Sequence, residues 1–169
     1  MRYFPLLLIT SLSLLPVASA LADSAQIPPC LSADIRLHSD DRNGLFDGMS
    51  QGGTSLVLHN AGRTSCMLPP LPTLVFSDAE HHPVTAERRT ARGMHPGPVL
   101  PPVIVTAGAE LQILLRWVAS DAFDGGHCIR PAFVSLALDG GTLTVPFNRT
   151  MCAAKGQTGY YSQSLTGTP

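Results

Sequence analysis

Short segments in which apolar and polar residues alternate recur along the chain and predict β-strands. In the clearest segment, 111–117, every second residue is apolar, and we expect the last of them, Trp117, to lie in the core. The segments with strand character are 33–37, 54–60, 73–77, 103–105, 111–117, 133–138 and 143–147. Helical periodicity is weak throughout. The pattern therefore predicts an all-β protein, an Ig-like antiparallel β-sandwich of about seven short strands.

The connections between these segments differ in length and composition. Asp139-Gly140-Gly141 separates the last two segments, and glycine there supplies the positive φ angles of a tight hairpin. The 42–53 loop is rich in glycine, with Leu45, Phe46 and Met49 between the glycines, and the 87–102 loop holds a run of prolines. Loops this long are uncommon in compact domains unless they are functional or disordered.

The first 22 residues have the features of a removed signal peptide. Arg2 gives a positive start, 4–17 is largely apolar, and small residues at 18–20 and 20–22 form A-x-A cleavage sites. We therefore expect a periplasmic or secreted protein with one domain at 23–153. The segment 154–169 is rich in Gly, Ser and Thr and is predicted to be a flexible tail. No later apolar run approaches the length of an integral membrane span.

Four cysteines, Cys30, Cys66, Cys128 and Cys152, follow the leader. An even number of cysteines in an oxidising compartment predicts two disulfides, and the absence of a C-x-x-C pair disfavours a zinc site. Cys30 precedes the first predicted strand and Cys66 follows the second, while Cys128 and Cys152 bracket the predicted hairpin. Cys30–Cys66 with Cys128–Cys152 is the simplest pairing. If both pairs share one end of the sandwich, Cys30–Cys152 with Cys66–Cys128 stays open.

A set of short motifs resembles a known family. The motifs are the run 55–62, with Asn60 at the strand end, then Ser65-Cys66-Met67-Leu68, Pro72, Ala107-Gly108-Ala109, Trp117, Cys128 and Cys152. Together, over residues 29–153, they resemble a family of secreted bacterial four-cysteine β-sandwich domains of unknown function. The chain departs from that pattern at Pro70, at Ala107 and after Cys152. The resemblance implies an Ig-like fold and no enzyme activity, and it transfers no site residues.

Charge excludes one class of partner. Only Arg2 of the 11 Lys and Arg residues lies in the leader, so the exported chain, with 12 Asp and Glu, has a net charge of about −2. This balance argues against nucleic acid as a partner. The one basic cluster lies in the 87–102 loop, whose candidate binding residues are Arg88, Arg89, Arg92, Met94 and His95. The alternative for this cluster is a solvated, purely structural loop.

Histidines suggest a second function class. His81 and His82 lie in a predicted turn with Asp78 and Glu80, and Met94 and His95 could add ligands suited to copper. Adjacent side chains on a strand point apart, so His81 and His82 could converge only in a loop. A periplasmic metal-binding protein of the copper type is therefore the alternative function, although no metal or other cofactor is required by the pattern.

Catalytic signatures are missing from the sequence. No G-x-S-x-G, H-E-x-x-H or S-x-x-K motif occurs, and the acidic pair Asp40-Asp41 is better explained as a turn cap. A hydrolase with scattered residues remains a second alternative. We therefore predict an exported, non-catalytic Ig-like module that binds a protein or a cell-envelope component. The 87–102 and 42–53 loops are its candidate binding segments, because sandwich domains place binding residues on loops.

Overall fold

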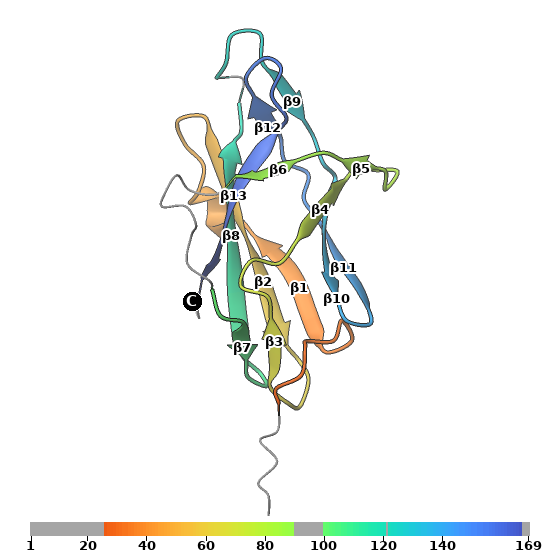
Figure 1. Cartoon of the computed structure of the whole chain (residues 1–169). Coiled ribbons are helices and arrows are strands. Elements are labelled where there is room, and N and C mark those ends of the chain that lie inside the picture. Colours follow the sequence, from red (N-terminus) through yellow and green to blue (C-terminus); the bar gives the residue numbers. More distant parts are fainter. Residues whose placement is uncertain (1–25, 90–99, 121, 167–169) are drawn as a thin grey trace, which may run out of the picture.

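The computed structural model describes residues 26–89, 100–120 and 122–166 (Figure 1). Among these residues no helix is long and apolar enough to cross a membrane. The strands and one 3-10 turn are β1 (Ile35–Asp40), η1 (Arg42–Gly44), β2 (Gln51–Asn60), β3 (Cys66–Leu68), β4 (Leu74–Ser77), β5 (Pro83–Val84), β6 (Glu87–Arg89), β7 (Val103–Val105), β8 (Glu110–Val118), β9 (His127–Ile129), β10 (Phe133–Leu138), β11 (Gly141–Pro146), β12 (Met151–Ala153) and β13 (Tyr160–Thr166).

These strands form two main sheets and two small ribbons. The larger sheet has the order β1-β2-β8-β13-β6, and the smaller sheet has the order β11-β10-β4-β5. The ribbons pair β3 with β7 and β9 with β12. The all-β sandwich expected from the alternating pattern is confirmed, and all seven predicted strands are present. Within the described residues the structure adds six strands, and the pairing of β6 with β13 is parallel.

The core lies between the two main sheets. Strand β8 alternates between buried and half-buried positions as predicted, so its apolar face, which ends at Trp117, points inward. The opposite sheet contributes Phe76 and Leu136, which are buried in the same cluster. Phe147, just after β11, joins the sheets, because its ring centroid lies 5.1 Å from Trp117 and 5.2 Å from Phe76. These ring contacts fix the position of the single tryptophan of the chain.

The hairpin between β10 and β11 follows the predicted turn. Leu138 pairs with Gly141, which leaves Asp139 and Gly140 as the two linking residues. Gly140 has a φ of 80°, a left-handed conformation that glycine adopts without the steric cost of a Cβ. The sequence therefore specified both the position of this turn and the register of the strands that it joins.

The four cysteines form the pairs Cys30–Cys66 and Cys128–Cys152. The simplest predicted pairing is confirmed. Cys128 and Cys152 face each other across β9 and β12, whereas Cys66 lies on β3, at the opposite end of the molecule (Figure 1). The possibility that both pairs share one end is therefore wrong, and with it the reason for considering the alternative connectivity. Each bridge fastens a short ribbon whose strands do not pair with the strands of the main sheets.

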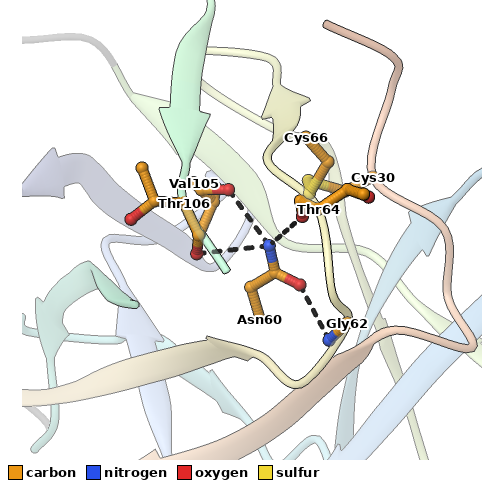
Figure 2. The surroundings of a disulfide bond; sticks show 7 residues. All are labelled: Cys30, Asn60, Gly62, Thr64, Cys66, Val105 and Thr106. Atoms are coloured by element: carbon orange, nitrogen blue, oxygen red, sulfur yellow. Dashed lines mark hydrogen bonds between the residues drawn. A yellow bond between two sulfur atoms is a disulfide. The ribbon is translucent and has the colours of Figure 1, made fainter. Parts of the chain in front are cut away.

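Asn60 organises the end of the sandwich near Cys30–Cys66 (Figure 2). Its buried side-chain Nδ2 lies 2.9 Å from the carbonyl oxygen of Thr64, 3.0 Å from that of Val105 and 3.2 Å from that of Thr106. Its Oδ1 accepts a 3.0 Å hydrogen bond from the backbone N–H of Gly62. One amide thus ties the end of β2 to the turn before Cys66 and to the segment after β7, which explains the asparagine of the four-cysteine motif.

The segment after the last cysteine departs from the prediction. Residues 154–169 were expected to form a flexible tail, but Tyr160–Thr166 forms β13, which pairs with β8 from Tyr161 to Thr166. On its other side β13 pairs with β6 over three residues. The predicted domain boundary at 153 is therefore wrong, because the larger sheet continues beyond it. The predicted leader at 1–22 lies outside the described residues.

Candidate binding surface

The 87–102 loop is described only at its ends. Arg88 donates a 3.1 Å hydrogen bond from Nη1 to the carbonyl oxygen of Leu71, and Arg89 donates a 2.9 Å bond from Nη2 to Oε1 of Gln157. The Arg89 guanidinium also lies 3.5 Å from the ring centroid of Tyr160. Arg89 therefore helps to hold β6 against β13, whereas Arg88 ties β6 to the segment between β3 and β4. The other candidate residues of this loop, Arg92, Met94 and His95, lie outside the described residues.

Tyr161 has the one resolved pKa shift among the described residues. Burial raises the pKa of its hydroxyl above the usual value of 10.0, and the positive charge of Arg88 partly opposes this change. The ring packs edge-on against Phe76, with 5.1 Å between centroids. The shift reflects packing in the core and does not mark a site for chemistry.

The histidine turn is built by its own acidic residue. Asp78 Oδ1 accepts hydrogen bonds from the backbone N–H groups of Glu80, at 3.0 Å, and of His82, at 2.8 Å. His81, with a φ of 64°, stacks on Phe133, whereas Nδ1 of His82 lies 3.5 Å from Oδ2 of Asp78. The two imidazoles thus have separate partners. In the described part of the chain, no three His, Cys, Asp or Glu side chains are grouped to hold a metal ion.

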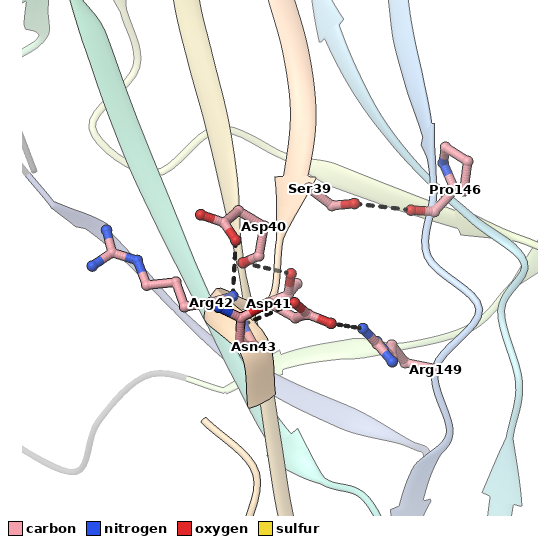
Figure 3. Close-up of polar contacts among 8 residues, drawn as sticks. Ser39, Asp40, Asp41, Arg42, Asn43, Pro146 and Arg149 are labelled. Atoms are coloured by element: carbon pink, nitrogen blue, oxygen red, sulfur yellow. Dashed lines mark hydrogen bonds and ion pairs between the residues drawn. The ribbon is translucent and has the colours of Figure 1, made fainter. Parts of the chain in front are cut away.

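The 42–53 loop is described along its whole length. Asp40 Oδ1 accepts a 2.8 Å hydrogen bond from the backbone N–H of Arg42, and Asp41 Oδ1 accepts a 3.2 Å bond from that of Asn43 (Figure 3). The two carboxylates cap the turn η1, as the sequence predicted. Asp41 also forms a 2.8 Å ion pair through Oδ2 with Nη2 of Arg149. Arg149 comes from the connection after β11, so this pair joins two distant segments.

The 42–53 loop and the connection after β11 contain most of the non-glycine residues whose backbone has a positive, left-handed φ in the described residues. In the described residues these are Arg42, Asn43, Met49, Ser50 and Asn148, and the sixth is His81 of the histidine turn. Such conformations cost free energy in a residue with a Cβ and persist where the surrounding structure imposes them, often at functional sites. We call the region formed by residues 39–54, 117–120 and 146–150 the Arg149 end.

The surface of the Arg149 end combines exposed apolar side chains with two hollows that are lined mostly by residues with polar side chains. Leu45 is 70% exposed and Met49 is 99% exposed, both on the 42–53 loop. Two hollows flank Arg149, one of about 160 Å³ beside Asp41 and Thr54, and one of about 420 Å³ beside Gly52. The guanidinium is neutralised in part by Asp41, so the region is suited to hydrogen bonding and apolar contact more than to binding a strong charge.

Sequence reasoning missed one half of this region. The 42–53 loop was selected for its length and glycine content, but nothing in the local pattern indicated that Asn148 and Arg149 lie beside it. Arg149 and Asp41 are 108 residues apart. A separate, more apolar groove of about 450 Å³ is lined by Pro70, Leu71 and Leu100 among others, and it adjoins a segment outside the described residues.

Comparison with known proteins agrees with the four-cysteine resemblance. No significant match was found among curated proteins or among solved structures. One family model matches residues 30–169, which includes both disulfides and strand β13. The match therefore extends past the domain boundary that the sequence suggested. The chain belongs to the family described as Domain of unknown function (DUF4232).

Proposed function

We propose that this protein is an exported, non-catalytic binding module, located in the periplasm or secreted, whose Arg149 end contacts a protein or cell-envelope component. Two features support export: the leader-like segment at 1–22 and the presence of two disulfides, which persist in oxidising compartments. The fold supports a binding role, because rigid β-sandwiches commonly present recognition loops at one end.

One observation supports the choice of the Arg149 end as the surface that contacts a partner. Leu45 and Met49 project from the 42–53 loop with most of their side-chain surface in solvent, while the base of that loop is held by the Asp41–Arg149 ion pair. Burying a large apolar side chain in a partner contributes roughly 1.5–3 kcal/mol. A held loop also loses little conformational entropy on binding. Exposed apolar residues on an ordered loop therefore favour recognition of a partner.

The polar groups of the same loop support a non-catalytic role. Asp40 and Asp41 both accept backbone hydrogen bonds, and Asp41 is also paired with Arg149. A general base needs a carboxylate that is available to a substrate proton. These two carboxylates are instead committed to the turn and the ion pair, so the loop is built to hold its shape.

Capture of a partner from envelope extract tests the proposal. The double variant Leu45→Ser with Met49→Ser should lose the captured partner identified by mass spectrometry, because both apolar contacts are removed. The matched control is Val75→Ser with Ile104→Ser, which changes two residues that are 50% and 52% exposed elsewhere. Both double variants should melt near the parent temperature. An unchanged partner list for the first variant would refute the role of the loop.

A further inference from the structure

A tight turn leads into β2, and its two central residues are Met49 and Ser50. The residues that flank them, Gly48 and Gln51, exchange two backbone hydrogen bonds of 3.0 Å and 2.9 Å. The φ angles of Met49 and Ser50 are 48° and 68°, and a positive φ at both central residues is what a type I′ turn requires. Ala119 donates a 2.8 Å hydrogen bond from its backbone N–H to the carbonyl oxygen of Ser50. The turn is therefore attached to the chain just after β8.

Methionine at the apex of this turn is unfavourable in two ways. Type I′ turns prefer Asn, Asp and Gly, because a left-handed backbone strains most residues that have a Cβ. The side chain of Met49 is also 99% exposed, so almost none of its apolar surface packs against the described residues. A residue that breaks two local rules without a gain in packing is expected at a functional position. Met49 is therefore better explained by the group that it presents to solvent than by a contribution to the fold.

The group that Met49 presents is a thioether, and a thioether sulfur can be oxidised. The other methionines of the described residues are shielded from solvent. Met67 on β3 is half-buried, and Met151 on β12 is 0% exposed. Because accessibility decides which sulfur an oxidant in solution reaches, the thioether of Met49 should react before the other two.

Hydrogen peroxide is a sufficient oxidant for this step. A lone pair of the sulfur attacks one peroxide oxygen, the S–O bond forms as the O–O bond breaks, and the departing hydroxide takes the proton of the transferred oxygen and leaves as water. The sulfur loses two electrons and the peroxide gains them. The product is a sulfoxide, which is polar where the thioether is apolar. Since the side chain of Met49 lies in solvent, the added oxygen should leave the stability of the fold unchanged.

We propose that Met49 is a site of peroxide oxidation and that its sulfoxide prevents partner contact at the Arg149 end. The inference rests on the proposed binding function, because Met49 and Leu45 are the exposed apolar contacts of that surface. A partner that buries the thioether against apolar groups would have to strip water from the polar sulfoxide, which costs free energy. The turn keeps its backbone hydrogen bonds in both states, so oxidation acts through the polarity of one side chain and not through the shape of the loop.

Peptide mapping after a peroxide titration tests the site itself. The folded protein is treated with increasing hydrogen peroxide, quenched with catalase and digested, and the sulfoxide at each methionine is measured by mass spectrometry. We expect Met49 to be converted before Met67 and Met151, because it is the most exposed of the three. Protein oxidised at Met49 should keep the melting temperature of the parent. Oxidation of Met67 or Met151 ahead of Met49 would overturn the proposal.

Two variants at the apex connect oxidation to binding. Met49→Leu keeps an apolar side chain of similar size and cannot form a sulfoxide, so it should capture the envelope partner equally before and after peroxide. Met49→Gln carries a polar group without any oxidant, so its capture should be about tenfold weaker or more, the loss of one buried apolar side chain. Both variants keep a Cβ at a φ of 48° and share the strain of the parent turn. A change in melting temperature therefore does not distinguish them.

Met94→Leu is the matched control, because Met94 is a methionine of the other candidate loop and lies outside the described residues. Capture by this variant should stay as sensitive to peroxide as capture by the parent. Capture that remains sensitive in Met49→Leu, or that becomes resistant in Met94→Leu, would refute the oxidation site and leave the binding role of the 42–53 loop in place. A parent that captures no partner dependent on Leu45 and Met49 would refute the binding function, and with it the proposed effect of oxidation, whatever order the peptide map shows.

Discussion

Asn60 should be among the most sensitive positions for stability, and the structure allows the size of the effect to be worked out. Its side-chain amide can donate two hydrogen bonds to the surrounding carbonyls and accepts one from Gly62, so Asn60→Ala removes about three bonds. Each group left unpaired in a buried site costs about 1–3 kcal/mol. At the low end of that range the variant should lose about 3 kcal/mol in the free energy of unfolding.

Urea unfolding, followed by the fluorescence of Trp117, measures this loss if the dependence on denaturant is unchanged. Asn60→Asp adds a second test, because a carboxylate there would face the carbonyl oxygens of Thr64, Val105 and Thr106. Repulsion and burial should raise the pKa of that carboxyl above its unfolded value of about 3.9. The folded variant then binds a proton more tightly than the unfolded chain. Its stability should fall as pH rises from about 4 through the raised pKa.

The exposed Asn148→Asp variant is the control, since it introduces the same charge without facing buried carbonyls. It should show neither the loss in stability nor the dependence on acid. A loss below about 1 kcal/mol for Asn60→Ala would refute the reasoning, because one unsatisfied buried group alone should cost that much. An Asn60→Asp variant whose stability does not rise on acidification would refute the electrostatic part.

Three further predictions concern other parts of the fold. Limited reduction followed by alkylation should label Cys128 first, because Cys128 is exposed whereas Cys30, Cys66 and Cys152 are buried. Permanent loss of the Cys128–Cys152 bridge should lower the free energy of unfolding by roughly 2–5 kcal/mol, measured by thermal or urea unfolding. Deleting 154–169 should abolish cooperative unfolding in circular dichroism, because β13 is lost from the larger sheet. An unchanged melting curve would instead support the interpretation of 154–169 as a flexible tail. Raising the pH through 10 should destabilise the parent, since the raised pKa of Tyr161 makes the folded state hold its proton. Tyr161→Phe should reduce this alkaline loss in pH-dependent melts.

Local pattern predicted the elements whose stability is local or whose burial is one-sided. Strand β8 was found because its inward face is apolar and its outward face is polar, which produces a period of two. The β10–β11 hairpin was found because its turn requires glycine at position 140. Cys128–Cys152 then followed from that hairpin, since the turn brings its flanking segments together.

Strand β13 could not be found in the same way. Its sequence, YYSQSLT, has few apolar residues, and it carries exposed Ser162 and Ser164 and half-buried Gln163. Its place in the sheet comes from backbone hydrogen bonds to β8 and β6, and a hydropathy pattern does not report such bonds. The same limit applies to Arg149, whose partner Asp41 is 108 residues away in the sequence. Contacts of this kind depend on tertiary topology, so they become visible only once the strands are arranged.

The two ends of strand β2 explain why the Arg149 end is a better candidate for binding than the rest of the surface. At the Asn60 end the buried amide has protein partners for both its nitrogen and its oxygen. Unpaired buried groups do not separate the two ends, because Nδ1 of His59 at the Asn60 end and Nε1 of Trp117 at the Gly52 end both lack a hydrogen-bond partner in the described residues. What separates them is the loop that precedes the Gly52 end, where Leu45 and Met49 are largely exposed while the Asp41–Arg149 ion pair holds the base of the loop. Exposed apolar side chains on a held loop favour contact with a partner, because little conformational entropy is lost when they are buried.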